Sequence, residues 1–530
     1  MSAADLGRRE VIGAGLALAT ASIARAQSPA GAASVSAAAG TFIGERSSGV
    51  LGFRGIRYGR AARFTAPVAE PRAVTPVRAT EWGPSSPQQG TGGGLTYGAD
   101  RLVFNEDCLQ LNVWTAEARQ GANKPVLFYI HGGAYSGGTA SSALLEGSAL
   151  AARGDVVVVT INHRLNAFGY LYLARLDPRF PDSGNAGQLD ILLALRWVRD
   201  NISAFGGDPA RVTVFGQSGG GAKIATMLGM PAAHGLFHRA VTMSGQQVTA
   251  SGPLHAEARA RAYLAKLGVP PDNLAPLLAM PAERLVEGLA ATDPILGGGV
   301  YFGPVLDMKW LTRHPFWPDA NPIGLSVPLI LGNTHDETRA FISPDSPKVK
   351  ALGWGNLADA LAPELRIDVL PEWVIAEYRG QFPTWSPTDV FYAATTAGRS
   401  WRGQVIEAEE RARAGAPAWV YQIDFTSRTD PRRGAFHTMD IPLAFGTLGP
   451  PGSQTGTGAD ARAASHAVQE SFVTFAKSGD PNHAGLPRWP KYDLKTRATM
   501  VFDAHSGIEN DPRRWQRELF ARIPYIQPGT

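Results

Sequence analysis

The chain has 530 residues, 44% hydrophobic and 18% charged, with 60 glycines and 39 prolines. This composition suits a soluble globular protein with a large core and many loops, and it argues against a disordered chain. The net charge is only +4 and no basic run interleaved with aromatic residues occurs, which argues against nucleic acid as a partner. Because Cys108 is the only cysteine, an intrachain disulfide is excluded.

The N-terminus has the pattern of an export signal. Arg8-Arg9 precede a small, apolar stretch at 11–23, and Ala24-Arg25-Ala26 resembles an A-x-A cleavage site. Paired arginines before a mildly hydrophobic core favour a twin-arginine signal in a bacterial chain. We therefore expect residues 1–26 to be a signal peptide and the mature protein to be periplasmic or secreted; the alternative is a disordered or helical N-terminus. No later apolar run reaches the roughly 18 residues of a spanning helix, so stable membrane insertion is not expected.

The rest of the chain alternates strand and helix patterns. Residues 28–39 are Ala/Ser-rich and predict a flexible lead-in, and 40–58 predict small antiparallel strands separated by glycines. Runs dense in Val, Ile, Leu and aromatic residues predict further strands at 109–114, 126–131, 156–161, 212–215, 240–243, 328–331 and 418–423. Helical patterns lie between them, as at 187–202, so the class is α/β with a mostly parallel sheet. Two helical inserts, 256–290 and 352–414, are expected to cover the sheet and wall the site.

One stretch combines a strand, a sharp turn and a helix around a serine. Val212-Thr-Val-Phe-Gly-Gln-Ser-Gly-Gly-Gly-Ala-Lys223 contains G-x-S-x-G, in which Gly216 and Gly220 leave room around Ser218. The pattern predicts a nucleophile elbow. A phosphate loop ending in Lys223 is the alternative, but its register is unfavourable, since Ala222 precedes the lysine and no Ser or Thr follows it to bind magnesium.

Further blocks lie in order on both sides of the elbow. They include Phe-Arg-Gly-Ile-Arg-Tyr at 53–58, His-Gly-Gly-Ala at 131–134, Asn-His-Arg-Leu at 162–165, His-Asp-Glu at 335–337 and Gly-Asp-Pro-Asn at 479–482, with shorter matches at 106–109, 112–114, 205–209 and 436–437. With these blocks the chain resembles the type-B carboxylesterase branch of the α/β-hydrolase superfamily, which includes carboxylesterases, cholinesterases and the non-catalytic neuroligins. The resemblance covers nearly the whole mature chain, and it implies one catalytic domain at 27–530 with helical inserts over the site.

The resemblance implies a catalytic triad in the superfamily's order of serine, acid and histidine. A serine hydroxyl is a poor nucleophile at neutral pH, so it needs an imidazole to take its proton and a carboxylate to orient that imidazole. Ser218 is the expected nucleophile, Glu337 the acid and His437 the base. Asp336 is the alternative acid.

The resemblance also assigns supporting residues. The N–H groups of Gly133, Ala134 and Gly219 are expected to bind the oxyanion, and Ser244 is expected to support Glu337 or His437 from behind. Gln217 stands where the family usually has Glu, which should make the site less attractive to cations.

Other departures from the family pattern lie near the acid and Cys108. Thr338 replaces a usual Gly, and Arg339 after it either faces the pocket, where it would pair with a substrate carboxylate, or is solvated. The usual disulfide partner of Cys108 falls near Ser86, so the loop at 85–98 is unstapled and is expected to be mobile.

The expected function is hydrolysis of small carboxylic esters through an acyl-enzyme, a chemistry that requires no metal or organic cofactor. A binding or adhesion homologue without chemistry is the alternative from another class, and an acyltransferase would use the same triad. Neither the preferred substrate nor the oligomeric state has a signature in the sequence.

Overall fold

The computed structural model describes residues 32–90, 102–527 and 529, so the predicted signal at 1–26 and most of the loop at 85–98 lie outside the described residues. Its central sheet has the strand order β1-β2-β3-β7-β9-β8-β10-β11-β12-β13-β14-β15, with β6 beside β2. The strands are β1 (Ala32–Ala37), β2 (Gly40–Ser47), β3 (Val50–Arg57), β6 (Val77–Arg78), β7 (Gln110–Thr115), β8 (Lys124–Ile130), β9 (Val157–Ile161), β10 (Gly207–Gln217), β11 (Arg239–Met243), β12 (Leu329–Thr334), β13 (Ala418–Ile423), β14 (Ala498–Phe502) and β15 (Gly507–Asn510). A separate ribbon pairs β4 (Gly59–Arg60) with β5 (Val68–Ala69).

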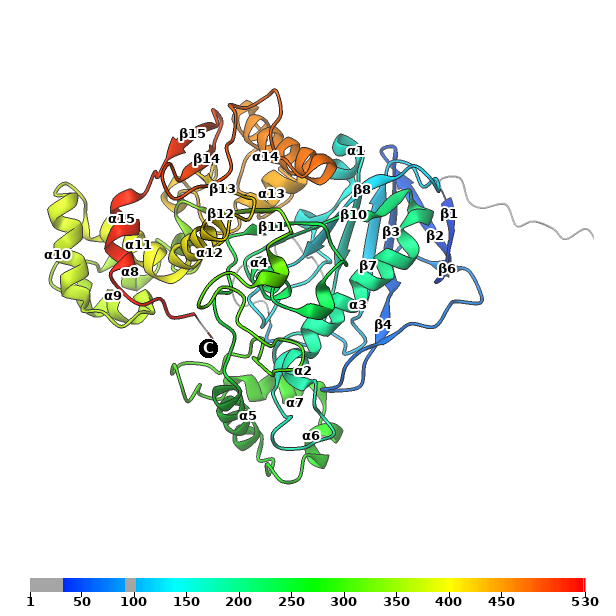
Figure 1. The fold of residues 1–530 in the computed structure, drawn as a ribbon. Coiled ribbons are helices and arrows are strands. Elements are labelled where there is room, and N and C mark those ends of the chain that lie inside the picture. The colour runs from blue at the N-terminus through cyan, green and yellow to red at the C-terminus, as the bar shows by residue number, and fades with distance from the viewer. Residues whose placement is uncertain (1–31, 91–101, 528, 530) are drawn as a thin grey trace, which may run out of the picture.

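The middle of the sheet is parallel and its two ends are antiparallel. Strands β9, β8, β10, β11, β12, β13 and β14 pair in parallel, while β1 to β3 with β7 at one end and β15 at the other run antiparallel to their neighbours. Because parallel strands must be joined by crossovers, helices lie on both faces (Figure 1). The predicted α/β class and mostly parallel sheet are confirmed.

The helices are α1 (Ser148–Gly154), α2 (Asn166–Tyr170), α3 (Ala186–Asn201), α4 (Gly219–Met227), α5 (Pro253–Leu267), α6 (Ala275–Ala279), α7 (Ala282–Glu287), α8 (Pro347–Lys350), α9 (Leu357–Leu365), α10 (Pro371–Gln381), α11 (Pro387–Thr396), α12 (Arg402–Arg413), α13 (Asp440–Phe445), α14 (Ala459–Ser478) and α15 (Arg514–Ala521). Alternate residues of β8 divide the core into two layers, since Phe128 packs with α3 and α4 whereas Tyr129 packs with α13 and α14. Side chains of a strand point alternately to its two faces, so this is a three-layer structure.

The predicted strands and helices agree with the structure to within a few residues, with two differences. Strand β10 begins at Gly207 rather than at residue 212, and its register against β8 shifts between Gly207 and Val212. The predicted flexible lead-in at 28–39 is wrong, because residues 32–37 form β1 and pair antiparallel with β2. Hydrogen bonds to a neighbouring strand order this edge, although its small residues have little β-propensity.

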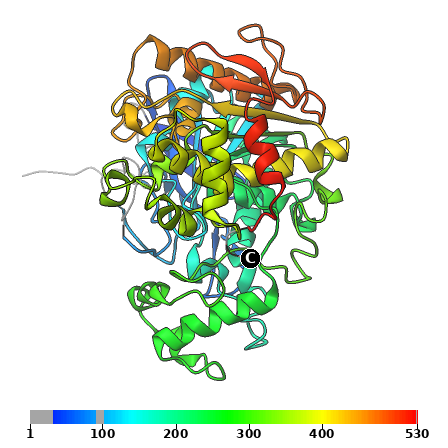
Figure 2. The same ribbon diagram turned by 90° about the vertical axis from the view of Figure 1, so that its left-hand side faces the viewer.

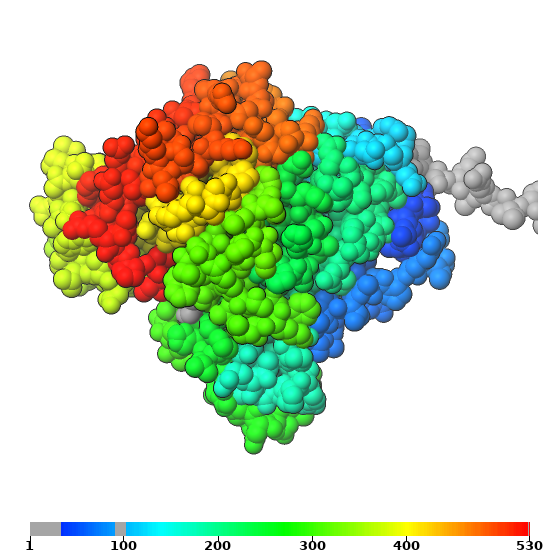
Figure 3. Space-filling model, in the orientation of Figure 1, coloured from blue at the N-terminus to red at the C-terminus, as the bar shows by residue number. Residues whose placement is uncertain are grey.

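The two predicted inserts form separate helical groups at the margin of the sheet. Helices α5 to α7 lie at the lower end and α8 to α11 at the left of Figure 1, and the quarter-turn view keeps α5 to α7 apart at the bottom (Figure 2). Each group has its own apolar cluster, and both project from the body of the molecule in the space-filling view (Figure 3). No helix of the described residues is long and apolar enough to cross a membrane.

Candidate active site

Ser218 lies in the turn between β10 and α4, at the centre of the sheet. Its φ is 56° and its ψ is −124°, a strained conformation for a residue with a side chain. The turn is tight because a Cβ at Gly219 would lie 2.0 Å from the carbonyl oxygen of Ala134. Ser218 itself is partly exposed, so the elbow presents its side chain at the carboxyl end of the strand as predicted from the motif.

Glu337 and His437 form a buried pair. Glu337 begins a 3₁₀ turn just beyond β12, and its Oε2 accepts a short hydrogen bond from Nδ1 of His437. Its Oε1 accepts from the backbone N–H of Thr334 at 2.8 Å and from Nδ2 of Asn333 at 3.1 Å. Burial alone would raise the pKa of Glu337, but His437 and the hydrogen bonds from Ser244 and Thr334 hold that pKa below its ordinary value. The carboxylate is therefore charged and fixed in place.

The other ring nitrogen of His437 faces the elbow. Gln217, the residue before Ser218, donates from its Nε2 to His437 Nε2 at 3.1 Å. Among the described residues, no hydrogen bond joins the Ser218 hydroxyl to His437. The structure thus brings His437 and Glu337 together and aims the imidazole at the residue next to Ser218. Contacts of this kind commonly tighten only when substrate is bound.

The predicted oxyanion loop lies directly against the elbow. A Cβ at Gly132 would be 3.1 Å from Ser218 Cβ, so the two segments are in contact. Within the described part of the chain, no hydrogen bond uses the N–H of Gly133 or Ala134, and Gly219 is the first residue of α4, where N–H groups lack helical partners. Backbone donors that are free and close to Ser218 are the arrangement that an oxyanion needs.

Lys223 holds this loop from behind. The residue is completely buried on α4, and its Nζ donates to the carbonyl oxygen of Ala134 at 2.7 Å while lying 5.1 Å from the centre of the Tyr135 ring. Ala134 has a positive φ of 51°, so the bond stabilises a loop conformation that a non-glycine residue rarely adopts. The ammonium group is therefore engaged by the Ala134 carbonyl and the Tyr135 ring within the protein, which argues against the phosphate-loop alternative.

Lys223→Met is expected to lower kcat on a p-nitrophenyl ester about tenfold with little change in KM. Removal of an oxyanion donor itself costs about 2.7 to 4 kcal/mol, so loss of the residue that positions such a donor should cost less. Lys124→Met is the matched control, because Lys124 is a buried lysine at the opposite end of β8 that pairs with Asp155 at 2.8 Å. Equal kcat losses in both variants would show that the effect is general destabilisation.

The same two variants should also differ in how the stability of the folded state depends on pH. Burial lowers the pKa of Lys223 from 10.5 to about 7. Between these values the unfolded chain binds a proton that the folded chain does not, so Lys223 makes the folded state more stable as pH rises from about 7 toward 10. Urea unfolding at pH 7 and pH 9 should show this rise in the wild type and in Lys124→Met, and a smaller rise in Lys223→Met.

Ser244 and Asp336 support the pair from behind. The Oγ of Ser244 accepts from the Thr334 N–H at 3.3 Å, and the Ser244 side chain helps to lower the pKa of Glu337. The Asp336 carboxylate accepts from the N–H of Ala435, two residues before His437, and forms no hydrogen bond with the imidazole. This placement favours Glu337 over Asp336 as the acid.

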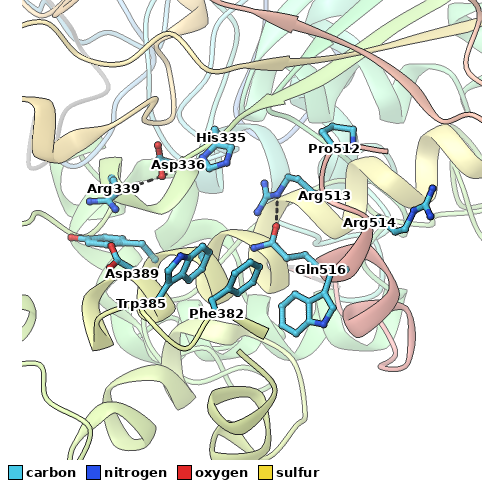
Figure 4. A pocket seen from close by; sticks show the side chains of 13 residues that line it. His335, Asp336, Arg339, Phe382, Trp385, Asp389, Pro512, Arg513, Arg514 and Gln516 are labelled. Carbon is cyan, nitrogen blue, oxygen red and sulfur yellow. Dashed lines mark hydrogen bonds and ion pairs between the residues drawn. The ribbon is translucent and has the colours of Figure 1, made fainter. Parts of the chain in front are cut away.

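Arg339 lies on a different cavity from Ser218. Its guanidinium donates to the carbonyl oxygen of Arg432 at 2.7 Å and lies 4.3 Å from the Tyr392 ring centre. The cavity, of about 480 Å³, is lined by His335, Asp336, Arg339, Phe382, Trp385, Asp389, Tyr392, Ala393 and residues 512–516, and includes neither Ser218 nor His437 (Figure 4). Arg339 is paired within the protein and does not face the triad.

Sequence reasoning missed two residues that lie against the pair. The ring of Phe341, 40% exposed, lies 4.8 Å from the ring of His437. Asp440 is fully buried nearby, and burial, followed by the charge of Glu337, raises its pKa to about 7. No sequence signal distinguishes Phe341 from an ordinary apolar residue. Asp440 lies three positions after His437, and this spacing could have suggested that it is close to the imidazole.

A nucleophile elbow at the centre of a mostly parallel sheet, with loops at the carboxyl ends of the strands supplying its partners, defines the α/β-hydrolase fold. The comparisons with known proteins narrow this class. The model of the carboxylesterase family matches residues 31–519, and the chain belongs to that family. It is a carboxylic ester hydrolase.

Individual relatives match over most of their length. The para-nitrobenzyl esterase of Bacillus subtilis is 36% identical over 496 residues, which are 90% of this chain and 96% of that protein. The phenmedipham hydrolase of Pseudarthrobacter oxydans is 32% identical, with 87% and 93% covered. The solved structure of a Geobacillus stearothermophilus carboxylesterase has a TM-score of 0.80 at 34% identity, with 92% of this chain and 99% of that chain covered.

Proposed function

We propose that Ser218, His437 and Glu337 hydrolyse small carboxylic esters through an acyl-enzyme. Ser218 Oγ attacks the ester carbonyl while His437 Nε2 takes its proton, and Glu337 keeps a proton on Nδ1 and stabilises the imidazolium. The observation that carries this assignment is the pair of hydrogen bonds on His437. One goes to Glu337 and the other comes from Gln217, and together they orient Nε2 toward the elbow.

The remaining steps use the same groups. The imidazolium protonates the leaving alcohol, and His437 then takes a proton from the water that attacks the acyl-enzyme. The N–H groups of Gly133, Ala134 and Gly219 stabilise the oxyanion in both steps. Gln217 must release His437 Nε2 when the Ser218 hydroxyl approaches, so its amide holds the imidazole in orientation only until substrate is bound.

Gln217 also bears on the choice of substrate. Its side chain is completely buried and uncharged, so it gives the centre no carboxylate for a cationic substrate such as a choline ester. The name of one relative, para-nitrobenzyl esterase, supports small benzyl esters as first substrates to test here.

A fluorophosphonate probe tests the assignment directly. The probe phosphonylates an activated serine, so labelling of the wild type that disappears in Ser218→Ala is the expected result. Labelling that persists in Ser218→Ala at another residue would overturn the role of Ser218. Labelling of neither protein would favour a binding homologue without chemistry.

We further propose that residues 27–530 form the catalytic domain and that residues 1–26 direct export through the twin-arginine route. Arg8-Arg9 and Ala24-Arg25-Ala26 support this proposal. A fusion of residues 1–40 to a reporter that folds before export should reach the periplasm of a bacterial host, and Arg8→Lys together with Arg9→Lys should block it. Equal export of both fusions would refute the twin-arginine route.

A further inference from the structure

Arg399 lies outside the proposed triad, and the ring of Phe341 lies between it and the ring of His437. The guanidinium carbon of Arg399 is 4.5 Å from the centre of the Phe341 ring, and that ring is 4.8 Å from the ring of His437. Arg399 is only 18% exposed, so its charge is held close to the triad in surroundings that contain little water. Electrostatic attraction is stronger in such surroundings than at an open surface.

The charge of Arg399 is poorly neutralised. Among the described residues its one ionic contact is Glu364 at 3.8 Å, and that carboxylate also accepts a hydrogen bond from Lys348 at 2.9 Å. No described residue forms a hydrogen bond with the Arg399 guanidinium. Burial, followed by the charge of Arg366, lowers the pKa of Arg399 to about 10. Arg399 and Lys348 thus share one carboxylate, and the donors of Arg399 are available.

Arg164 shows what a satisfied buried arginine looks like in this protein. It is 4% exposed, and its guanidinium donates to both oxygens of Asp190, at 2.6 and 2.9 Å. Arg399 has no such partner, although it carries the same planar set of donors, which matches a carboxylate in two parallel hydrogen bonds. An ionised carboxyl group is therefore the ligand that its geometry and its charge both fit.

The backbone places Arg399 on an unusual turn that is tied to the triad. Residues Ala397–Trp401 form a π-helical turn between α11 and α12, a feature that often occurs at functional sites. Thr338, directly after Glu337, hydrogen-bonds through its Oγ1 to the hydroxyls of Thr395 at 2.8 Å and Thr396 at 2.9 Å. The turn that carries Arg399 is thereby fixed relative to the acid of the triad.

A second aromatic residue, Tyr301, packs beside the oxyanion loop. Burial raises the pKa of Tyr301 to about 12, and the charges of Arg366 and Arg399 oppose this rise. The ring of Tyr301 meets the ring of Tyr135, the residue after Ala134, at 6.4 Å edge to face. The contact that places Arg399 beside the centre is the one with Phe341, whose ring lies against that of His437.

We infer that Arg399 forms a carboxylate-binding subsite, and that the enzyme prefers esters carrying a second, ionised carboxyl group, such as half-esters of dicarboxylic acids. The inference rests on the proposed function, since it names the substrate class of the same site. Because a single ring, that of Phe341, lies between Arg399 and His437, the substrates to test carry their carboxylate a short aliphatic chain or one aromatic ring away from the ester carbonyl. A small ester of this type would place its ester carbonyl at Ser218 while its carboxylate reaches Arg399.

The test compares matched acid and amide substrates. Ethyl para-carboxybenzoate and ethyl para-carbamoylbenzoate differ only in charge, as do monomethyl adipate and methyl adipamate. The wild type should show a kcat/KM at least about tenfold higher for each acid than for its amide, equivalent to about 1.4 kcal/mol. In Arg399→Gln this ratio should fall to near one, with the amide substrates hydrolysed at nearly the wild-type rate.

Arg379→Gln is the matched control. Arg379 is an exposed arginine of the same insert, and its guanidinium carbon lies 4.5 Å from the centre of the Trp354 ring. It therefore makes the same kind of arginine–aromatic contact as Arg399, but away from the triad. Its acid-to-amide ratio should equal that of the wild type. A ratio in Arg399→Gln that equals the wild-type ratio, or a wild-type ratio near one, would overturn the inference.

The outcome separates this inference from the proposed function. If the wild type hydrolyses both members of each pair through Ser218 without preferring the acid, the subsite is wrong and the triad stands. If neither member is hydrolysed and no p-nitrophenyl ester is turned over, the proposed function fails first. Should Arg399→Gln not fold, inhibition of the wild type by terephthalate, compared with terephthalamide, gives the same test, and equal inhibition by the two would contradict the subsite.

Discussion

Ser218→Ala is expected to lower kcat on p-nitrophenyl acetate by at least about a thousandfold. The substitution removes the nucleophile and leaves only the oxyanion donors and substrate binding, which retain a small residual rate over water. The folded state should change little, because Ser218 is partly exposed and among the described contacts its hydroxyl makes no hydrogen bond. The strain of the turn stays the same, since alanine has the same Cβ.

The measurement is steady-state kinetics on protein purified from a host that lacks its own esterases, with thermal unfolding recorded in parallel. A wild-type melting profile together with the loss of turnover assigns the effect to chemistry. Near-normal kcat in Ser218→Ala, once contamination is excluded, would end the assignment of Ser218 as nucleophile.

Glu337→Gln is expected to lower kcat by about three to four orders of magnitude at neutral pH. Oε1 of Glu337 accepts hydrogen bonds from Thr334 and Asn333, so the glutamine oxygen would stay there and its amide nitrogen would face His437. The amide nitrogen can only donate, and Nδ1 would have to become the acceptor. The ring proton would then move to Nε2, where it blocks proton transfer from Ser218.

Asp336→Asn is the control for this prediction. Asp336 precedes Glu337 and accepts from the N–H of Ala435, but it does not hydrogen-bond to His437. Its loss should reduce kcat by about tenfold or less, since it supports the loop rather than the imidazole. A larger loss in Asp336→Asn than in Glu337→Gln would exchange the roles of the two carboxylates.

The sequence alone predicts the fold well, because the signals of buried strands and of the elbow are local. Strand β13 was predicted with the bounds that the structure gives, 418–423, and α3, predicted at 187–202, to within one residue at each end. Apolar residues dominate β13, which lies between Pro417 and Asp424, and they recur at helical spacing in α3. The resemblance to the type-B carboxylesterases, rather than periodicity, supplied the acid and the base, which lie 100 residues apart.

The contacts around the triad could not be predicted in the same way. Lys223 belongs to a local motif, but its bond to Ala134 depends on how the loop after β8 packs on α4. Arg399 and Phe341 meet only because the turn after α11 folds back on the acid. The strand β1 was missed for a similar reason, since pairing with β2 orders a segment whose own residues favour no structure.

The hydrogen bonds from Thr338 to the end of α11 have a consequence for engineering. These bonds tie the α8 to α11 insert to Glu337, the proposed acid, so that a shift of the insert would also move Glu337. Replacing this insert with that of another enzyme to change selectivity would therefore also disturb turnover. Turnover would be kept only if Thr395 and Thr396 were retained in the new insert. The group α5 to α7 lacks this direct link to the acid among the described contacts, and it is the better place for such an exchange.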